Sequence, residues 1–133
     1  MSEKGSLEGK KILFVEDDEF FADIMTMKLK GSGCEVRHVA DGDSVFPAIS
    51  KEKPDVMILD IMLPGGMDGY AIIEKLKADP VNGKIPIIIL SNLSREEDIE
   101  KGMKLGAFKY MTKAHVTPND VVGSLQEAIA SVH

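Results

Sequence analysis

Cysteine is nearly absent from this 133-residue chain, which carries Cys34 and no second thiol. A single cysteine excludes an internal disulfide and agrees with a reducing compartment, so we expect a cytoplasmic protein. No apolar run approaches the roughly 20 residues that cross a bilayer, which argues against a membrane span. Residues 1–11 are polar and charged, without the apolar stretch of a signal peptide.

Positive charge is also scarce. The chain has 16 Lys and Arg residues against 22 Asp and Glu, a net charge of -6, which argues against direct nucleic-acid binding. Hydrophobic residues make up 44% of the chain and charged residues 29%, as in ordinary soluble domains of this size. We expect one domain over residues 10–133, after a lead-in over residues 1–9 that has no core pattern and frays.

Hydrophobic patterning predicts five strands that alternate with five helices. Short apolar runs bounded by turn signals are typical of strands buried on both faces of a parallel sheet. The expected strands are residues 11–15, 35–40, 56–59, 85–90 and 107–111, and the expected helices are about 19–30, 42–50, 69–77, 94–105 and a last helix after 117. Strict alternation of this kind implies a doubly wound α/β fold, (βα)5.

Several helix starts carry local signals. Asp41 can cap the second helix, and Pro47 predicts that this helix starts late or kinks. Ser94 and Glu97 have the spacing of a capping box at the fourth helix. Thr117 followed by Pro118 predicts a hydroxyl cap and a proline in the first turn of the last helix.

Chemically useful side chains follow the predicted strands at the point where each strand ends. Glu16 and Asp17 follow the first strand, Asp60 the third, Ser91 the fourth, and Lys113 comes just after the fifth. Because the carboxyl ends of parallel strands lie at one edge of the sheet, these groups can converge there. Asp60, between a buried strand and a glycine-rich turn, is the first candidate.

This combination of groups suits phosphoryl transfer onto an aspartate. Three crowded carboxylates repel one another, and a divalent cation relieves that repulsion. Mg²⁺ prefers such hard oxygen ligands and bridges to phosphate. Lys113 adds a positive charge and Ser91 a hydroxyl that can bond a phosphoryl oxygen. A carboxylate nucleophile, a metal, a lysine and a hydroxyl complete the set.

Four strings, VEDD, LDIMLP with MDG, IIILS and KYMTK, follow one another along the chain. Together they resemble the receiver domain of two-component response regulators, over about residues 10–131. The resemblance implies a flavodoxin-like sheet of strand order 2-1-3-4-5. It also implies a phosphorelay switch, not an enzyme, that takes its phosphoryl group from a sensor histidine kinase or a histidine phosphotransfer protein.

The resemblance assigns roles at the matching positions. Asp60 becomes the phosphoacceptor. Asp17 binds Mg²⁺ directly (Mn²⁺ can substitute), and Glu16 binds it directly or through water. Asp60 and the backbone carbonyl of Met62 complete the protein's share of the coordination.

The remaining implied roles concern catalysis and switching. Lys113 and Ser91 assist the transfer, and Ser91 then moves towards the phosphoryl group, which opens space for Tyr110. The face formed by the fourth helix, the fifth strand and the last helix would change, and it could serve a partner or a homodimer.

Some positions depart from the family pattern. The loop after Asp60 reads LPGGMDG, one residue longer than in many members, and Asn92 replaces a small residue. Ala114 stands where a proline with a cis bond is usual, so we expect either a trans bond with a rearranged loop or a strained cis bond. Met62 and Leu93 are apolar where polar residues help to orient the attacking water, which predicts slow self-dephosphorylation.

Two other functions remain open. A phosphatase of the haloacid-dehalogenase type would need a second acid two residues after the nucleophile, and Met62 occupies that position. A receiver-like docking module that is never phosphorylated stays open because of Asn92 and Ala114.

Overall fold

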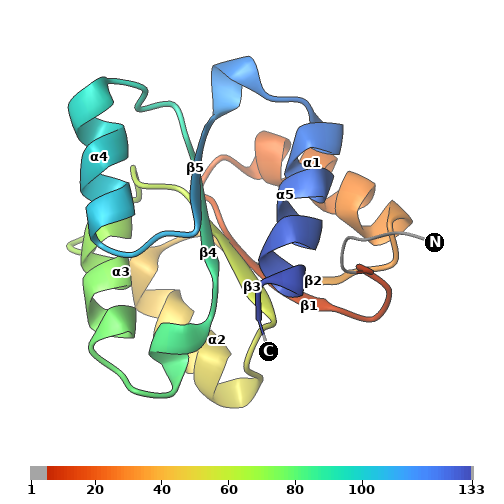
Figure 1. The fold of residues 1–133 in the computed structure, drawn as a ribbon, viewed down its shortest axis with the longest axis horizontal. Helices are drawn as coiled ribbons and strands as arrows, with labels where there is room; N and C mark the ends of the chain where they lie inside the picture. The colour runs from red at the N-terminus through yellow and green to blue at the C-terminus, as the bar shows by residue number, and fades with distance from the viewer. Residues whose placement is uncertain (1–5, 133) are drawn as a thin grey trace.

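The five apolar segments form one parallel sheet in the computed structural model, which describes residues 6–132. Its strands are β1 (Lys11–Val15), β2 (Glu35–Val39), β3 (Val56–Leu59), β4 (Ile87–Ser91) and β5 (Lys109–Thr112). All neighbouring pairs are parallel, and the order is β2-β1-β3-β4-β5 (Figure 1). The flavodoxin-like fold and its strand order are confirmed.

Helices cover both faces of this sheet (Figure 1). One face carries α1 (Glu19–Gly31) and α5 (Pro118–Ala130), and the other carries α2 (Val45–Lys51), α3 (Gly69–Lys77) and α4 (Glu96–Lys104). Within residues 6–132, no helix has the length and apolar character that a membrane span requires.

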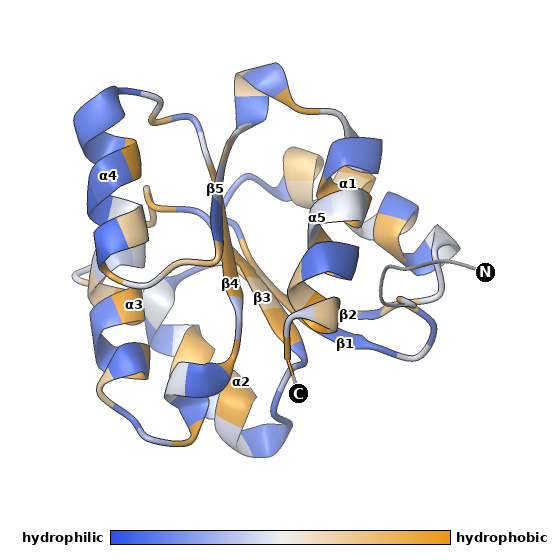
Figure 2. Cartoon of the chain, viewed as in Figure 1, coloured by the Kyte–Doolittle hydropathy of each residue, from blue (hydrophilic) through white to orange (hydrophobic). Residues whose placement is uncertain are grey.

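The alternating side chains of each strand feed two separate cores. Ile12 and Phe14 of β1 pack with α1 and α5, whereas Leu13 and Val15 pack with α2 and α3. Burial on both faces explains why the central strands are continuously apolar. Figure 2 shows the result, with apolar strands in the middle and helices whose polar sides face outwards.

The edges of β4 and β5 differ from the predicted ones. β4 starts two residues later than expected, because Ile85 closes the short 3-10 turn Asn82–Lys84 through a bond from its N–H to Asn82. β5 also starts late, because the Ala107 N–H bonds to Gly102 at the end of α4. At its other end, β4 extends one residue beyond the predicted end and includes Ser91.

Most predicted caps are confirmed. Thr117 and Asp120 form a capping box at α5, with Pro118 at the first position. Asp41 caps a 3-10 turn over Gly42–Ser44, so α2 starts late, at Val45, and Pro47 falls in its first turn. The backbone N–H groups of a helix's first turn have no acceptor within the helix, so a proline, which has no N–H, is tolerated at this position.

The capping box predicted for α4 is wrong. The cap position is Arg95, and its side chain makes no capping hydrogen bond. The Arg95 Nε lies 3.5 Å from carboxylate oxygens of both Glu97 and Asp98. Glu97 therefore pairs with the arginine instead of reaching back to Ser94.

Residues 6–9, the described part of the lead-in, contact the folded domain. Residues 1–5 lie outside the described residues, and the domain boundary at residue 10 stays a prediction. Leu7 is buried in the core with α1 and α5, and the Gly9 N–H donates to the Gly33 carbonyl at 2.9 Å. Leu7 and Gly9 therefore contact the folded domain, although a lone leucine gives no local pattern that predicts a core site. Fraying of the lead-in stays a prediction.

We expect the free energy of unfolding to fall in steps as the side chain of Ile88, which is fully buried in β4, is shortened. Ile88→Val should lower the free energy of unfolding by about 1 kcal/mol and Ile88→Ala by about 2–5 kcal/mol, because the larger truncation leaves a larger cavity. Urea denaturation measures both. Val81→Ala, at an exposed site, is the control and should change it by less than about 0.5 kcal/mol. Equal effects at the two sites would contradict this packing.

Candidate functional site

Strand register brings the predicted site residues to one edge of the sheet. Val15 of β1 lies opposite Leu59 of β3, so Glu16 and Asp60 leave adjacent strands at the same level. The Asp60 N–H donates to the Val15 carbonyl at 3.0 Å, which continues the pairing up to the acid. On the other side, Ser91 lies opposite the residue before Lys113. The predicted convergence is confirmed.

Lys113 joins two of these acids. Its Nζ donates to Asp60 Oδ2 at 2.8 Å and lies 2.6 Å from Glu16 Oε1. The lysine side chain is only 10% exposed. Although burial opposes the charged form, hydrogen bonds to Asp60 and Glu16 raise the pKa of Lys113 above its ordinary value. The ammonium group therefore stays charged within the site.

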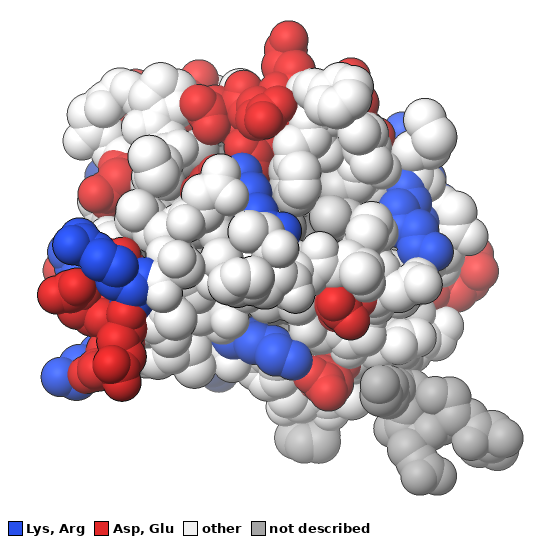
Figure 3. Space-filling view, turned by 90° about the horizontal axis from the view of Figure 1, so that it is seen from above, with Lys and Arg blue, Asp and Glu red and all other residues white. Residues whose placement is uncertain are grey.

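Glu16, Asp17 and Asp60 form an acidic cluster. One oxygen from each lies within 4.8 Å of the others. Burial raises the pKa of Glu16, and the nearby Asp60 charge adds to this, while the bond to Lys113 opposes it. Seen from above the sheet edge, acidic side chains gather beside a positive one (Figure 3).

The donor set fits a divalent cation. Glu16 Oε1 is buried, and the Lys113 ammonium group, 2.6 Å away, is its one charged partner within residues 6–132. One lysine cannot balance three carboxylates. All three supply hard oxygen ligands, and Asp17 is exposed, so the site is open to water, as Mg²⁺ requires.

A close contact with α3 fixes the loop after Asp60. The Gly69 N–H donates to the Ile61 carbonyl at 2.9 Å. A Cβ on Gly69 would lie 2.5 Å from the Asp60 carbonyl oxygen, so only glycine allows this approach. Asp60 Oδ1 accepts from the Met62 N–H at 3.2 Å, and the Met62 side chain is exposed. The carboxylate is therefore held at both oxygens.

Ser91 and Tyr110 lie beside each other, as their predicted switch role requires. The Tyr110 hydroxyl donates to the Leu93 carbonyl at 2.7 Å, and Ser91 Oγ accepts from the Leu93 N–H at 3.3 Å. Burial, followed by the proximity of Tyr70 and Asp98, raises the pKa of Tyr110 well above its usual range. The tyrosine is therefore a neutral donor to the segment between β4 and α4.

The loop that departs from the family at Ala114 does not displace the lysine. All peptide bonds within residues 6–132 are trans, so the trans alternative holds. Lys113–His115 form a short 3-10 turn directly after β5. The lysine still reaches both acids.

Sequence reasoning missed three contacts around the site. The ring of Phe21 on α1 lies 4.6 Å from Lys113 Nζ. The Tyr70 hydroxyl on α3 donates to the Asp98 carbonyl of α4 at 3.0 Å, and Lys101 Nζ lies 4.3 Å from the Tyr70 ring. Each contact joins residues far apart in the chain, and no local pattern signals any of them.

Comparison with known families decides the identity of the fold. The model of the response regulator receiver domain matches residues 12–126. The chain belongs to this family. It is a receiver domain of the kind that carries phosphoryl signals in two-component systems.

Curated relatives agree with this assignment. The receiver domain is 34% identical over 103 residues to the response regulator PleD of Caulobacter vibrioides, and 36% identical over 104 residues to the regulatory protein PhoP of Bacillus subtilis. These matches cover 77% and 78% of the chain but only 22% and 42% of the relatives. The chain thus spans less than half the length of either protein.

Solved structures agree as well. The receiver domain of a histidine kinase from Syntrophus aciditrophicus superposes with a TM-score of 0.85 at 30% identity, covering 93% of this chain and 92% of that one. The BeF3-activated receiver domain of Klebsiella pneumoniae RstA gives 0.82 at 30% identity, covering 90% and 97%. The receiver domain of the Pseudomonas aeruginosa kinase PA1611, with magnesium coordinated in its active-site cleft, gives 0.83 at 28% identity, covering 92% and 99%.

We expect Glu16→Gln to stabilise the metal-free receiver domain. Because the pKa of Glu16 is higher in the folded chain than its ordinary 4.5, ionising this carboxyl costs folding free energy. The cost is absent below pH 4.5 and complete once the pH exceeds the folded-state value. Thermal unfolding in EDTA should therefore show a higher Tm for the variant at pH 8, and no gain at pH 4.

Glu127→Gln is the matched control for this measurement. Glu127 pairs with Lys109 at 3.3 Å, but both side chains are more than 40% exposed. Exposed pairs contribute at most about 1 kcal/mol, so its Tm should change little. A lower Tm for Glu16→Gln at pH 8 would show that pairing with Lys113 outweighs the burial of the charge.

Proposed function

We propose that this receiver domain accepts a phosphoryl group on Asp60. The observation that carries the proposal is the position of the Asp60 carboxylate. Its Oδ2 bonds to Lys113 at 2.8 Å, its Oδ1 is held by the Met62 N–H, and the acids Glu16 and Asp17 lie beside it. A carboxylate oriented in this way is a prepared nucleophile.

The transfer itself exchanges one bond to phosphorus for another. An Asp60 oxygen attacks the phosphorus, the bond from phosphorus to the donor's leaving atom breaks, and that atom takes up a proton. The Lys113 ammonium group can move from the Asp60 carboxylate to a negatively charged phosphoryl oxygen, because it is compact and is carried on a flexible side chain. The Ser91 hydroxyl can donate to another oxygen. The chain then serves as a switch, not an enzyme acting on a separate substrate.

The same proposal places Mg²⁺ at Glu16, Asp17 and Asp60, with the Met62 carbonyl as a further ligand and Mn²⁺ as a substitute. When bound, the ion neutralises negative charge on the phosphoryl oxygens. The magnesium in the PA1611 receiver domain and the cluster of three carboxylates, which one lysine does not neutralise, support this site.

We further propose a phosphohistidine on a sensor histidine kinase or a histidine phosphotransfer protein as the donor. Two of the similar solved receiver domains come from histidine kinases, which supports a phosphorelay. A docking module that is never phosphorylated has less support, because Ala114 leaves Lys113 in contact with Asp60.

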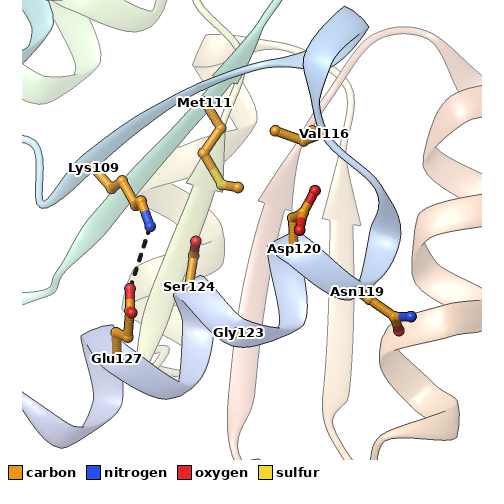
Figure 4. A pocket seen from close by; sticks show the side chains of 8 residues that line it. All are labelled: Lys109, Met111, Val116, Asn119, Asp120, Gly123, Ser124 and Glu127. Carbon is orange, nitrogen blue, oxygen red and sulfur yellow. Dashed lines mark hydrogen bonds and ion pairs between the residues drawn. The ribbon is translucent and has the colours of Figure 1, made fainter.

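The output face in this proposal consists of α4, β5 and α5, and a homodimer could form through it. Tyr110 links the site to this face through Leu93. Between β5 and α5 lies an open hollow of about 390 Å³ that includes Met111 and the buried Ser124. An ion pair from Lys109 to Glu127 spans its side (Figure 4). The lining is mostly polar, with Met111 and Val116 as its apolar side chains and a charged pair at one side, and such a mixed surface suits a protein contact.

We expect the wild type to gain about 80 Da, the mass of one phosphoryl group, when it is incubated with Mg²⁺ and phosphoramidate. Asp60→Asn keeps the shape of the side chain but removes the nucleophile, so it should gain nothing. Intact-mass spectrometry measures both. Asp68→Asn, at the N-cap of α3, is a second carboxylate-to-amide control and should still be phosphorylated.

Omitting Mg²⁺ should abolish the gain in mass, because the crowded carboxylates then lack the cation. Phosphorylation of Asp60→Asn to the wild-type extent would place the phosphoryl group elsewhere. No gain in the wild type, with intact circular dichroism, would favour the docking module.

We expect the phosphorylated domain to hydrolyse slowly. Met62 is exposed and Leu93 half-buried, and neither offers a polar atom to orient the attacking water. Met62→Asn should speed hydrolysis by about fivefold, the effect of roughly one hydrogen bond. Decay of the phosphorylated mass after removal of the donor measures this. Met62→Leu should match the wild type, and a wild-type half-life of seconds would contradict the expectation.

A further inference from the structure

We propose that Phe21 is a positioning residue for Lys113 in this reaction, an inference that rests on the proposed function. The face of its ring holds the ammonium group near Asp60 when a divalent ion occupies the carboxylates. The observation behind it is the distance of 4.6 Å between Lys113 Nζ and the centre of the Phe21 ring.

The ring is itself fixed in place. Phe21 lies in the first turn of α1 and is half-buried against the core. Phe14, fully buried in β1, meets it edge-on, with 6.4 Å between ring centres and 67° between ring planes. The neighbouring Phe20 is 77% exposed. Of these two phenylalanines, only Phe21 is both immobilised and beside the lysine.

The acids alone cannot hold the lysine throughout the reaction. Without metal, Glu16 and Asp60 attract the ammonium group at 2.6 and 2.8 Å. A divalent cation needs oxygens of the same acids and repels the ammonium, so this attraction weakens when the ion binds. The lysine is then needed for the phosphoryl group, yet its flexible stem is poorly constrained.

An aromatic face meets this need. Its quadrupole attracts a cation but supplies no ligand atom, so it does not compete for the metal. Because the Lys113 side chain is only 10% exposed, water screens the contact weakly. Loss of such an interaction corresponds to about a threefold to tenfold change in rate. The ring should therefore matter most once the metal is bound.

The test weakens the quadrupole without removing the ring. Phenylalanine at position 21 is replaced site-specifically by analogues with one, two and three ring fluorines, and the same series is made at the exposed Phe20. Mg²⁺-dependent phosphorylation by phosphoramidate is followed at saturating Mg²⁺. We expect the rate to fall stepwise along the series at position 21, by about threefold to tenfold in total, and to stay constant along the series at position 20.

Phe21→Leu, which keeps an apolar side chain but has no ring, should lower the rate to a similar extent, and circular dichroism checks its fold. Constant rates along the fluorinated series at position 21, with a phosphorylated wild type, would overturn the inference, even if Phe21→Leu is slow, because ring volume alone would then explain the loss. A wild type that gains no phosphoryl group would instead overturn the proposed function.

Discussion

Repulsion among carboxylates at one edge of the sheet is the constraint on which this receiver domain depends. The parallel register delivers Glu16 and Asp60 side by side, and Asp17 lies next to them. Buried charges of one sign are costly without a partner. Lys113 offsets part of that cost but cannot neutralise three acids. The remaining negative charge favours a divalent cation, and in the proposed function that cation would attract the phosphoryl group.

The surrounding fold holds these charges where they would otherwise separate. Glu16 and Asp60 continue from strands that are buried on both faces, so the acids cannot move apart without disturbing the core. Gly69 brings the start of α3 against the Asp60 backbone. The buried sheet thus supplies the stability that keeps the crowded carboxylates together at the ends of its strands. Functional sites commonly contain such an unfavourable arrangement, which the rest of the fold stabilises.

Sequence patterns could predict whatever depends on local periodicity or on strand order. β3 and α3 occur at the predicted residues, because continuous apolar runs and helical spacing reflect burial directly. Asp60 and Lys113 could be paired because parallel strands share an edge. The cap predicted at Ser94 is wrong, because Arg95 pairs with Glu97 and Asp98 and the spacing rule does not account for that competition. The contact between the Phe21 ring and Lys113 could not be predicted either, because side-chain contacts between distant segments leave no periodic signal in the sequence.

Weak anchoring makes α4 the element that this site can move most easily. Within this helix, all of it described, Gly102 is the one buried residue. Tyr70 bonds to the helix and Tyr110 to the segment before it, and each such bond contributes only about 1 kcal/mol net. A Cβ on Gly102 would lie 3.1 Å from the Tyr110 ring, so the helix backbone packs closely against the tyrosine. In the proposed function, a new phosphoryl charge on Asp60 would act on the same few contacts, and a differential interaction of a few kcal/mol is enough to shift such an equilibrium.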